Sequence, residues 1–171
     1  MTSAAPLPPP VLTLAGALAQ RLLPRGPSPG PVRRAAAQTL AVASGVVMFG
    51  ASARFLAAGT TVDPRAPERA AALVTAGPNR ISRNPMYLGM IGLLAAHAVV
   101  RDRWAAWLPV AAVAVALDRM QVPLEERALR ERFGAEYEAY CAAVPRWLGR
   151  PGGSPAAGGA PEAGAAPGSR P

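Results

Sequence analysis

Lysine is absent from this sequence, and cysteine and histidine occur once each, as Cys141 and His97. A single cysteine excludes an intramolecular disulfide and a thiolate metal cluster. A single histidine argues against a histidine-based metal site, so we expect no bound metal. Because His97 lies within an apolar run, we interpret it as a packed, hydrogen-bonded side chain and not as a catalyst. The 171 residues allow one domain, or one domain with tails.

The positive charge comes from arginine alone and gives a formal net charge of +8 and a pI near 11.3. In a soluble protein such a pI would suggest nucleic-acid binding. Here the arginines flank apolar runs and do not follow one helical face, which is typical of the ends of membrane spans. We therefore expect contact with membrane lipid and no nucleic acid. The arginine-, alanine- and proline-rich composition hints at a bacterial genome rich in GC.

Two apolar runs near the start of the chain predict membrane helices. Prolines break residues 1–10, and residues 11–23 form the first run. A signal peptide is the alternative, but it would need a charged n-region that is missing here. The second predicted span covers residues 35–57, of which residues 35–53 carry no charge. Because a bilayer core of ~30 Å needs about 20 helical residues, this run is long enough to cross it.

Two further apolar runs, separated by a charged tripeptide, predict a helical hairpin. The first arm covers residues 85–100, Arg101-Asp102-Arg103 forms the turn, and the second arm covers residues 104–121. The apolar part of the second arm ends before Asp118, which limits it to about 21 Å of helix. We therefore expect its inner end to emerge into a polar or water-filled site and not into lipid.

Arginine is unevenly distributed between the two sides of these four spans. Twelve arginines fall in or beside the loop between the second and third spans, or after the last span, and six fall on the other side. Cytoplasmic segments carry an excess of basic residues. We therefore predict that both termini and the loop over residues 59–84 are cytoplasmic, and that the protein is integral to a bacterial cytoplasmic membrane.

The stretch from Gly77 to Gly89 reads Gly-Pro-Asn-Arg-Ile-Ser-Arg-Asn-Pro-Met-Tyr-Leu-Gly and leads into the third span. Pro85 suits the first turn of a helix, and Asn84 before it is a good N-cap. A helix start attracts anions, and Arg80 and Arg83 would strengthen that attraction. We interpret the stretch as one wall of a binding site. Anchoring to lipid headgroups is the alternative role of the two arginines.

A C-terminal amphipathic helix is predicted over residues 123–144, with a bend at Gly134. Its apolar stripe consists of Leu129, Phe133, Tyr137, Tyr140 and Val144. These positions follow helical spacing, and the stripe extended backwards reaches Glu126, with Glu125 one step round. The two carboxylates could receive a cationic group of a ligand. Alternatively, they could favour a helix start, with Glu126 pairing with Arg130.

Together these segments predict an all-α polytopic membrane protein with about four transmembrane helices and a C-terminal amphipathic helix. It would consist of a flexible N-terminus at residues 1–10, a membrane domain at residues 11–148 and a disordered tail at residues 149–171, where Gly, Pro, Ala and Ser predominate. A small-residue stripe at Gly89, Gly92 and Ala96 favours close helix packing and permits either a monomer or a homodimer.

In order and spacing, these features resemble the integral-membrane methyltransferases of the isoprenylcysteine carboxyl methyltransferase and phospholipid methyltransferase group. The resemblance covers about residues 50–148. It rests on Gly77-Pro78, Arg83-Asn84-Pro85-Met86-Tyr87-Leu88-Gly89, Glu125-Glu126-Arg127-Ala128-Leu129, Phe133-Gly134, Tyr137, Tyr140 and Val144-Pro145-Arg146-Trp147. Asn79 departs from the family, which often has an aromatic residue there, and Asn84 stands where the eukaryotic enzymes have histidine.

The resemblance implies an enzyme that uses S-adenosylmethionine as methyl donor at the cytoplasmic ends of the last helices. It implies that Glu126, together with Glu125, would bind the cationic methionyl part of the donor. Arg83 and the helix start at Asn84 would face the donor's carboxylate, and Tyr87 would line the pocket. Two further residues of the same motif complete this expected donor site: Pro85 and Gly89.

Such an enzyme needs in-line positioning and water exclusion above all, because the donor's own sulfonium makes the methyl group reactive. No catalytic residue is assigned, although Arg146 is a candidate for binding the acceptor or the donor. The acceptor would be a lipophilic small molecule or lipid that enters from the bilayer. Carboxyl methylation of the isoprenylcysteine type is the first interpretation, and N-methylation of an amino-phospholipid headgroup is the alternative. A non-catalytic helical assembly or transport subunit is the alternative of another class.

Overall fold

A computed structural model describes residues 7–59 and 71–149, and every regular element in these two ranges is helical. The all-α prediction is therefore confirmed for the described part of the chain. The predictions for residues 1–6, 60–70 and 150–171, which include almost all of the tail, lie outside the described residues.

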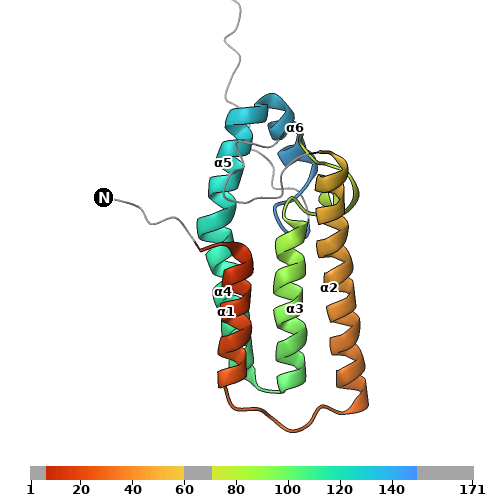
Figure 1. The fold of residues 1–171 in the computed structure, drawn as a ribbon, viewed down its shortest axis with the longest axis vertical. Coiled ribbons are helices and arrows are strands. Elements are labelled where there is room, and N and C mark those ends of the chain that lie inside the picture. Colours follow the sequence, from red (N-terminus) through yellow and green to blue (C-terminus); the bar gives the residue numbers. More distant parts are fainter. Residues whose placement is uncertain (1–6, 60–70, 150–171) are drawn as a thin grey trace, which may run out of the picture.

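Four long helical segments run alternately up and down (Figure 1). They begin with α1 (Pro9–Leu22), α2 (Pro31–Ala57) and α3 (Pro85–Arg101). The fourth starts at Trp104 and continues as α4 (Trp107–Ala116), a π-helical segment (Leu117–Gln121) and α5 (Val122–Phe133). The short helix α6 (Ala135–Ala143) folds back at the end where α3 begins, and a 3-10 turn (Gly77–Arg80) precedes α3.

Proline and glycine residues explain most of the helix boundaries. Pro9, Pro31 and Pro85 each lie in the first turn of their helix, where a missing N–H costs nothing. Pro9 therefore begins α1, and the prediction that prolines break the chain up to residue 10 is wrong there. Gly134 has a positive φ of 49°, so the bend predicted at this glycine is a complete break, and residues 122–143 form two helices that meet there.

Within residues 7–59 and 71–149, two helices are long and apolar enough to cross a bilayer: α2, with 27 residues, and the continuous helix Trp104–Phe133, with 30 residues. The other two predicted spans are shorter, because α1 has 14 residues and α3 has 17. Only 11% of the most apolar window of α2 is buried. Its outward side chains include Val42, Val46 and Phe49, and an apolar outer surface of this extent is typical of helices that face lipid.

The bundle is held together by close contacts between helices at glycine positions. The most extensive contact joins α2 to α3. A Cβ atom on Gly92 would lie 2.1 Å from Oγ of Ser44, and one on Gly89 would lie 2.6 Å from Cβ of Met48. The predicted close packing is therefore confirmed. Because the stripe already faces α2, it gives no argument for a dimer, and the oligomeric state stays a prediction.

Buried polar groups connect α1 to the hairpin formed by α3 and α4. Gln20 has no exposed surface, and its Nε2 donates to the carbonyl oxygens of Leu94 at 3.0 Å and Ala106 at 2.8 Å. Its Oε1 lies 2.8 Å from Nδ1 of His97. His97 is thus hydrogen-bonded within the bundle, as predicted. At the turn, Asp102 adopts the left-handed conformation, and Arg101 donates to the carbonyl of Leu23.

Candidate active site

The most buried charged group at the α3-start end of the bundle is the Glu126 carboxylate on α5, which is 4% exposed. Arg83, in the loop before α3, lies 3.0 Å from its Oε1. Arg146, after α6, makes a two-pronged contact, with Nη2 2.7 Å from Oε2 and Nε 3.1 Å from Oε1. Arg130 lies one helical turn away at 3.7 Å, which confirms the pair expected from its i+4 spacing.

The cluster has a net positive charge, because three arginines surround one carboxylate. Burying a carboxylate is costly unless opposite charges and hydrogen bonds compensate for the lost water. Arg83 and Arg146 supply that compensation from segments 43 and 20 residues away in the chain. The hydrogen bond to Glu126 raises the pKa of Arg146 above its ordinary value, so Arg146 stays charged.

Arg146 also connects this cluster to a carboxylate on the π-helical segment. Its Nη1 lies 3.4 Å from Oδ1 of Asp118, and the indole Nε1 of Trp147 donates to the same oxygen at 2.7 Å. Nε of Arg119 lies 3.1 Å from Oδ2 of Asp118. The inner end of the second hairpin arm therefore lies among polar groups, as expected. The helix itself does not end at Asp118, because it continues through the π-helical segment into α5.

Glu125 has different partners from Glu126, although the two are adjacent in the chain. The hydroxyl of Tyr87, on the first turn of α3, donates to Oε1 of Glu125, and Nε2 of Gln121 donates to the same oxygen at 2.7 Å. Tyr87 is 5% exposed and Gln121 is 4% exposed, so the contact is enclosed. Glu125 thus joins α5 to α3, whereas Glu126 joins α5 to the loop and the C-terminal segment.

The loop before α3 and the segment after α6 are held together by their backbones. Arg83 donates its N–H to the carbonyl oxygen of Pro145 at 2.9 Å. Oγ of Ser82 and Nδ2 of Asn84 donate to the carbonyl oxygen of Arg146 at 2.9 and 3.0 Å. Asn84 does occupy the N-cap position, but its side chain makes no capping bond. The predicted N-cap position is therefore confirmed, while Nδ2 of the side chain connects the start of α3 to the C-terminal segment.

Pro85 and Gly89, the remaining residues of the expected donor site, also lie at the α3-start end, but Gly89 faces α2. Pro85 is the first residue of α3 and is buried. Gly89, one turn further, faces Ser44 and Met48 of α2. It therefore contributes to helix packing on the α2 side. The expected donor-site role of both residues stays a prediction.

Two buried polar atoms here have no hydrogen-bond partner within the described ranges: Nε of Arg83 and Oδ1 of Asn79. The backbone oxygen of Asn79 accepts a 2.7 Å bond from the hydroxyl of Tyr140. Burial raises the pKa of Tyr140 to about 12, so its hydroxyl remains a donor at neutral pH. One unpaired donor and one unpaired acceptor at this end are what a ligand carrying both kinds of group would satisfy.

A cavity of about 440 Å³ opens beside this cluster, between α3 and α4. Its apolar wall is formed by Leu88, Ile91, Ala114 and Val115. Its other lining residues are Asp118, Arg119, Trp147 and Leu148. We call this cavity the hairpin groove. It joins an apolar surface between the two hairpin arms to a carboxylate and a guanidinium.

Sequence reasoning missed Asp118, Ser82 and Trp147 as parts of this region. Asp118 did have a signal in the sequence, since it is a single carboxylate directly after a long apolar run. Ionisable residues at membrane depth tend to be functional. No local signal marks Ser82 or the indole of Trp147, since their partners lie 64 and 29 residues away.

Comparison with known proteins shows which family the chain matches. A family model described as phospholipid methyltransferase matches residues 32–136, which is more than half of the chain. The match includes Arg83, Tyr87 and both glutamates and stops before Arg146. A protein of Haemophilus influenzae described as an uncharacterized protein is 35% identical over 63 residues, which is 37% of this chain and all of that protein. No solved structure matches the chain significantly.

Proposed function

The chain belongs to the phospholipid methyltransferase family, and from this premise we propose that it transfers a methyl group from S-adenosylmethionine to the amino headgroup of a membrane phospholipid. The family suggests methyltransferase activity, use of this donor and a membrane location. The acceptor is the part that we propose. The family description favours the phospholipid over the carboxyl group of an isoprenylcysteine, which was the first interpretation of the sequence.

The single observation that carries the proposal is the hairpin groove, which ends at Asp118 and Arg119. A phospholipid with an amino headgroup has acyl chains, a phosphate and an ammonium group. The apolar wall suits the chains, Arg119 suits the phosphate, and Asp118 suits the ammonium. An isoprenylcysteine carboxylate would meet Asp118 as a like charge, which would disfavour it.

The residues around Glu126 fit the methionyl end of the donor. The carboxylate of the donor's methionyl group could accept a hydrogen bond from the unpaired Nε of Arg83. The ammonium of the same group could donate to the unpaired Oδ1 of Asn79. Because Glu126 is already surrounded by arginines, we propose that it holds Arg83 and Arg146 in place. Direct binding of Glu126 to the donor's cationic part stays a prediction.

S-adenosylmethionine would supply an electrophilic methyl group on a positively charged sulfur. The acceptor ammonium would first lose a proton to water or to Asp118, which frees the nitrogen lone pair. That nitrogen would then form the new C–N bond as the bond from methyl carbon to sulfur breaks. The contribution of the chain is to align the two groups and exclude water. Asp118 would orient the nitrogen, and Trp147 and Arg146 would hold the Asp118 carboxylate.

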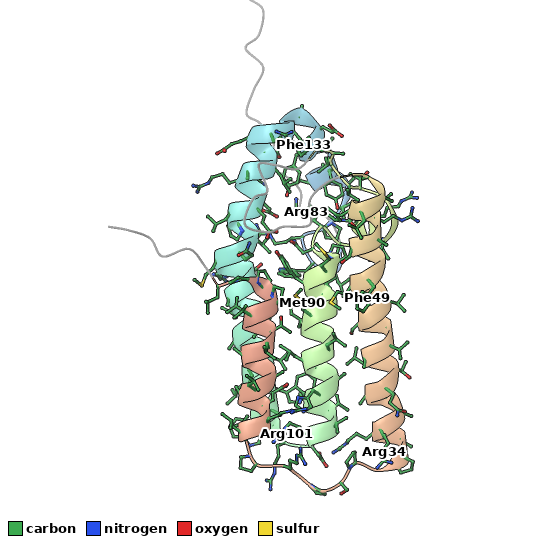
Figure 2. The ribbon with its side chains drawn as sticks, in the orientation of Figure 1. Arg34, Phe49, Arg83, Met90, Arg101 and Phe133 are labelled. Atoms are coloured by element: carbon green, nitrogen blue, oxygen red, sulfur yellow. The ribbon has the colours of Figure 1, made fainter. Side chains whose placement is uncertain are left out.

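The arrangement in the membrane is also part of the proposal. We infer that all four helical segments cross the bilayer, with Arg101 and Arg83 marking opposite ends (Figure 2). The alternating directions of the helices put the end of α2 and the start of α3 on one side of the bundle, with α6 (Figure 1). This agrees with cytoplasmic termini and a cytoplasmic middle loop. The domain limits at residues 11–148 remain proposed.

The test is methyl transfer by purified protein in detergent from methyl-labelled donor to phosphatidylethanolamine or to a prenylated cysteine. We expect label in N-methylated lipid that resists alkaline hydrolysis. Asp118→Asn should reduce transfer to lipid while leaving donor binding intact, and Glu136→Gln at an exposed position of α6 is the matched control. Label in an alkali-labile ester would support the carboxyl acceptor instead. No saturable donor binding at all would support the non-catalytic class.

A further inference from the structure

The hairpin end of the bundle carries a large excess of positive charge. Segments 21–34 and 101–103 lie at this end and contain six arginines and one acidic residue, Asp102. Asp102 forms an ion pair with Arg33 at the start of α2. The pair is open to its surroundings, because the side chains are 43% and 31% exposed. Arg101 is buried, but the other five arginines are exposed, and one partly exposed carboxylate cannot neutralise them. This surface therefore attracts anions.

Two cavities border the Arg33–Asp102 pair. The smaller, of about 250 Å³, is lined by Arg33, Ala98, Val99, Asp102, Arg103, Trp104 and Trp107. We call it the arginine cavity. It has guanidinium groups from two elements, the first turn of α2 and the hairpin turn. The larger, of about 590 Å³, is also lined by Arg33 and Asp102 and includes Gly30, Pro31 and Ala36. The ion pair therefore borders open space in both cavities.

The arginines of this cavity are only lightly engaged by the described part of the chain. Nε of Arg103 lies 3.5 Å from the carbonyl oxygen of Arg25, which is at the limit of a hydrogen bond. Arg33 contacts Asp102 through one terminal nitrogen. Both side chains are exposed and keep N–H donors available to a ligand with several acceptor oxygens.

The opposite wall of the arginine cavity is apolar. Ala98 and Val99 come from α3, and Trp107, which is 46% exposed, comes from the first turn of α4. Trp104 is 77% exposed beside them. Indole rings collect at the level of lipid headgroups, where one part of the ring meets hydrocarbon and the N–H meets water. The cavity thus combines phosphate-binding groups with a wall that continues onto the apolar outer surface.

We propose that the arginine cavity binds the headgroup of an anionic phospholipid in the leaflet opposite the Glu126 cluster. The phosphate lies between Arg33 and Arg103, where guanidinium groups can each offer two parallel donors. The glycerol and the first acyl carbons lie along Val99 and Trp107. The apolar wall favours a lipid over a free phosphate ion, since an ion would leave that wall without a contact.

The experiment is native mass spectrometry of the full-length protein in a neutral detergent, titrated with phosphatidylglycerol or phosphatidylcholine. A neutral micelle has no surface potential. The measured lipid retention therefore reports a specific site and not a general attraction between a charged surface and the arginines. We expect retained phosphatidylglycerol on the unchanged protein. Arg33→Gln with Arg103→Gln should weaken retention about tenfold, the loss expected for charge-assisted hydrogen bonds.

The matched control is Arg21→Gln with Arg34→Gln, which removes the same charge from exposed arginines at the same end outside the cavity. We expect little change in it. Equal loss in both double variants would overturn the site, because charge alone would then explain binding. Glycerol 1-phosphate that binds as tightly as the lipid would overturn the lipid as occupant.

A third variant makes the opposite prediction. Asp102→Asn frees Arg33, and asparagine tolerates the left-handed conformation that Asp102 adopts in the turn. We expect tighter retention of phosphatidylglycerol by this variant. Unchanged or weaker retention would contradict the geometry, because the Arg33 guanidinium would then not face the lipid phosphate.

Discussion

The two ends of the helical bundle both carry arginine, but they use it in different ways. At the α3-start end, Arg83 and Arg146 contact a carboxylate that is 4% exposed and also contact the backbone around it. At the hairpin end, Arg33 and Arg103 are exposed, and the one carboxylate there is partly open to its surroundings. The first set forms an enclosed network of side chains, and the second forms an open charged surface.

This difference indicates different tasks. Charges that share a buried counter-charge hold fixed positions, and fixed positions are what a reaction depending on alignment requires. Charges that are exposed and in excess gain little from one another, so they are available to a partner outside the chain. Arginine content alone therefore does not identify a site. Burial and the number of carboxylate partners separate the two ends.

The largest effect should come from breaking the enclosed network. In Glu126→Gln, Arg83 and Arg146 lose their shared counter-charge, and the loss of one partner of a buried pair costs about 3–5 kcal/mol. We expect donor binding to fall by roughly 100-fold or more. Equilibrium binding of labelled donor in detergent measures this, with circular dichroism to check folding. Unchanged donor affinity in a folded variant would refute a site built around Glu126.

A smaller effect is expected from loosening the contact between the loop and the C-terminal segment. Ser82→Ala and Asn84→Ala each remove one donor to the carbonyl oxygen of Arg146. Each loss of a buried hydrogen bond should cost about 1 kcal/mol, and the double variant should free residues 144–148. Amide hydrogen exchange over that segment is the measurement. Exchange that stays as slow as in the unchanged protein would show that other contacts hold it.

The α3-start end should also show an alkaline sensitivity. Burial raises the pKa of Tyr140 from its ordinary 10.0 to about 12, so the folded protein holds this proton more tightly than the unfolded chain. The stability from this group is complete below pH 10 and is lost as the pH rises through about 12. Thermal unfolding between these pH values should show a decline that is smaller in Tyr140→Phe. An identical decline in both proteins would contradict this assignment.

The smallest effect should come from breaking the ion pair at the hairpin end. Because Arg33 and Asp102 are both partly exposed, Asp102→Asn should change the free energy of unfolding by less than about 1 kcal/mol. Thermal unfolding in detergent, compared with Glu126→Gln, gives the contrast directly. A loss as large as that of Glu126→Gln would mean that the two ends are not different in kind.

Much of the helical framework follows from local sequence signals. Pro85 marks a helix start and the Arg101-Asp102-Arg103 tripeptide marks the hairpin turn, because each effect depends on one or two residues. Pro31 carries the same signal, but the predicted span began four residues later, at residue 35. Gly92 indicated close packing because only hydrogen fits where Ser44 approaches. The contact between Arg83 and Glu126 was expected only through the family resemblance.

Other features have no local signal. The Asn84 side chain had two possible partners, its own helix and the Arg146 carbonyl, and the choice depends on a segment 62 residues away. The π-helical segment could not be predicted, because Leu117 to Gln121 have no composition that separates them from an α-helix. The link from Trp147 to Asp118 depends on how α6 folds back at Gly134.

The π-helical segment between α4 and α5 sets the direction in which Glu125 and Glu126 point around the helix axis. A helix turns by roughly 100° per residue, and a π turn accommodates one extra residue. If Leu117–Gln121 wound as a regular α-helix instead, the extra residue would rotate everything beyond it by roughly 100° about the axis. Glu125 and Glu126 would keep nearly the same depth but point elsewhere. In the helix Trp104–Phe133, the number of residues fixes how deep the two carboxylates lie along the axis, and the single π turn fixes the direction in which they point around it.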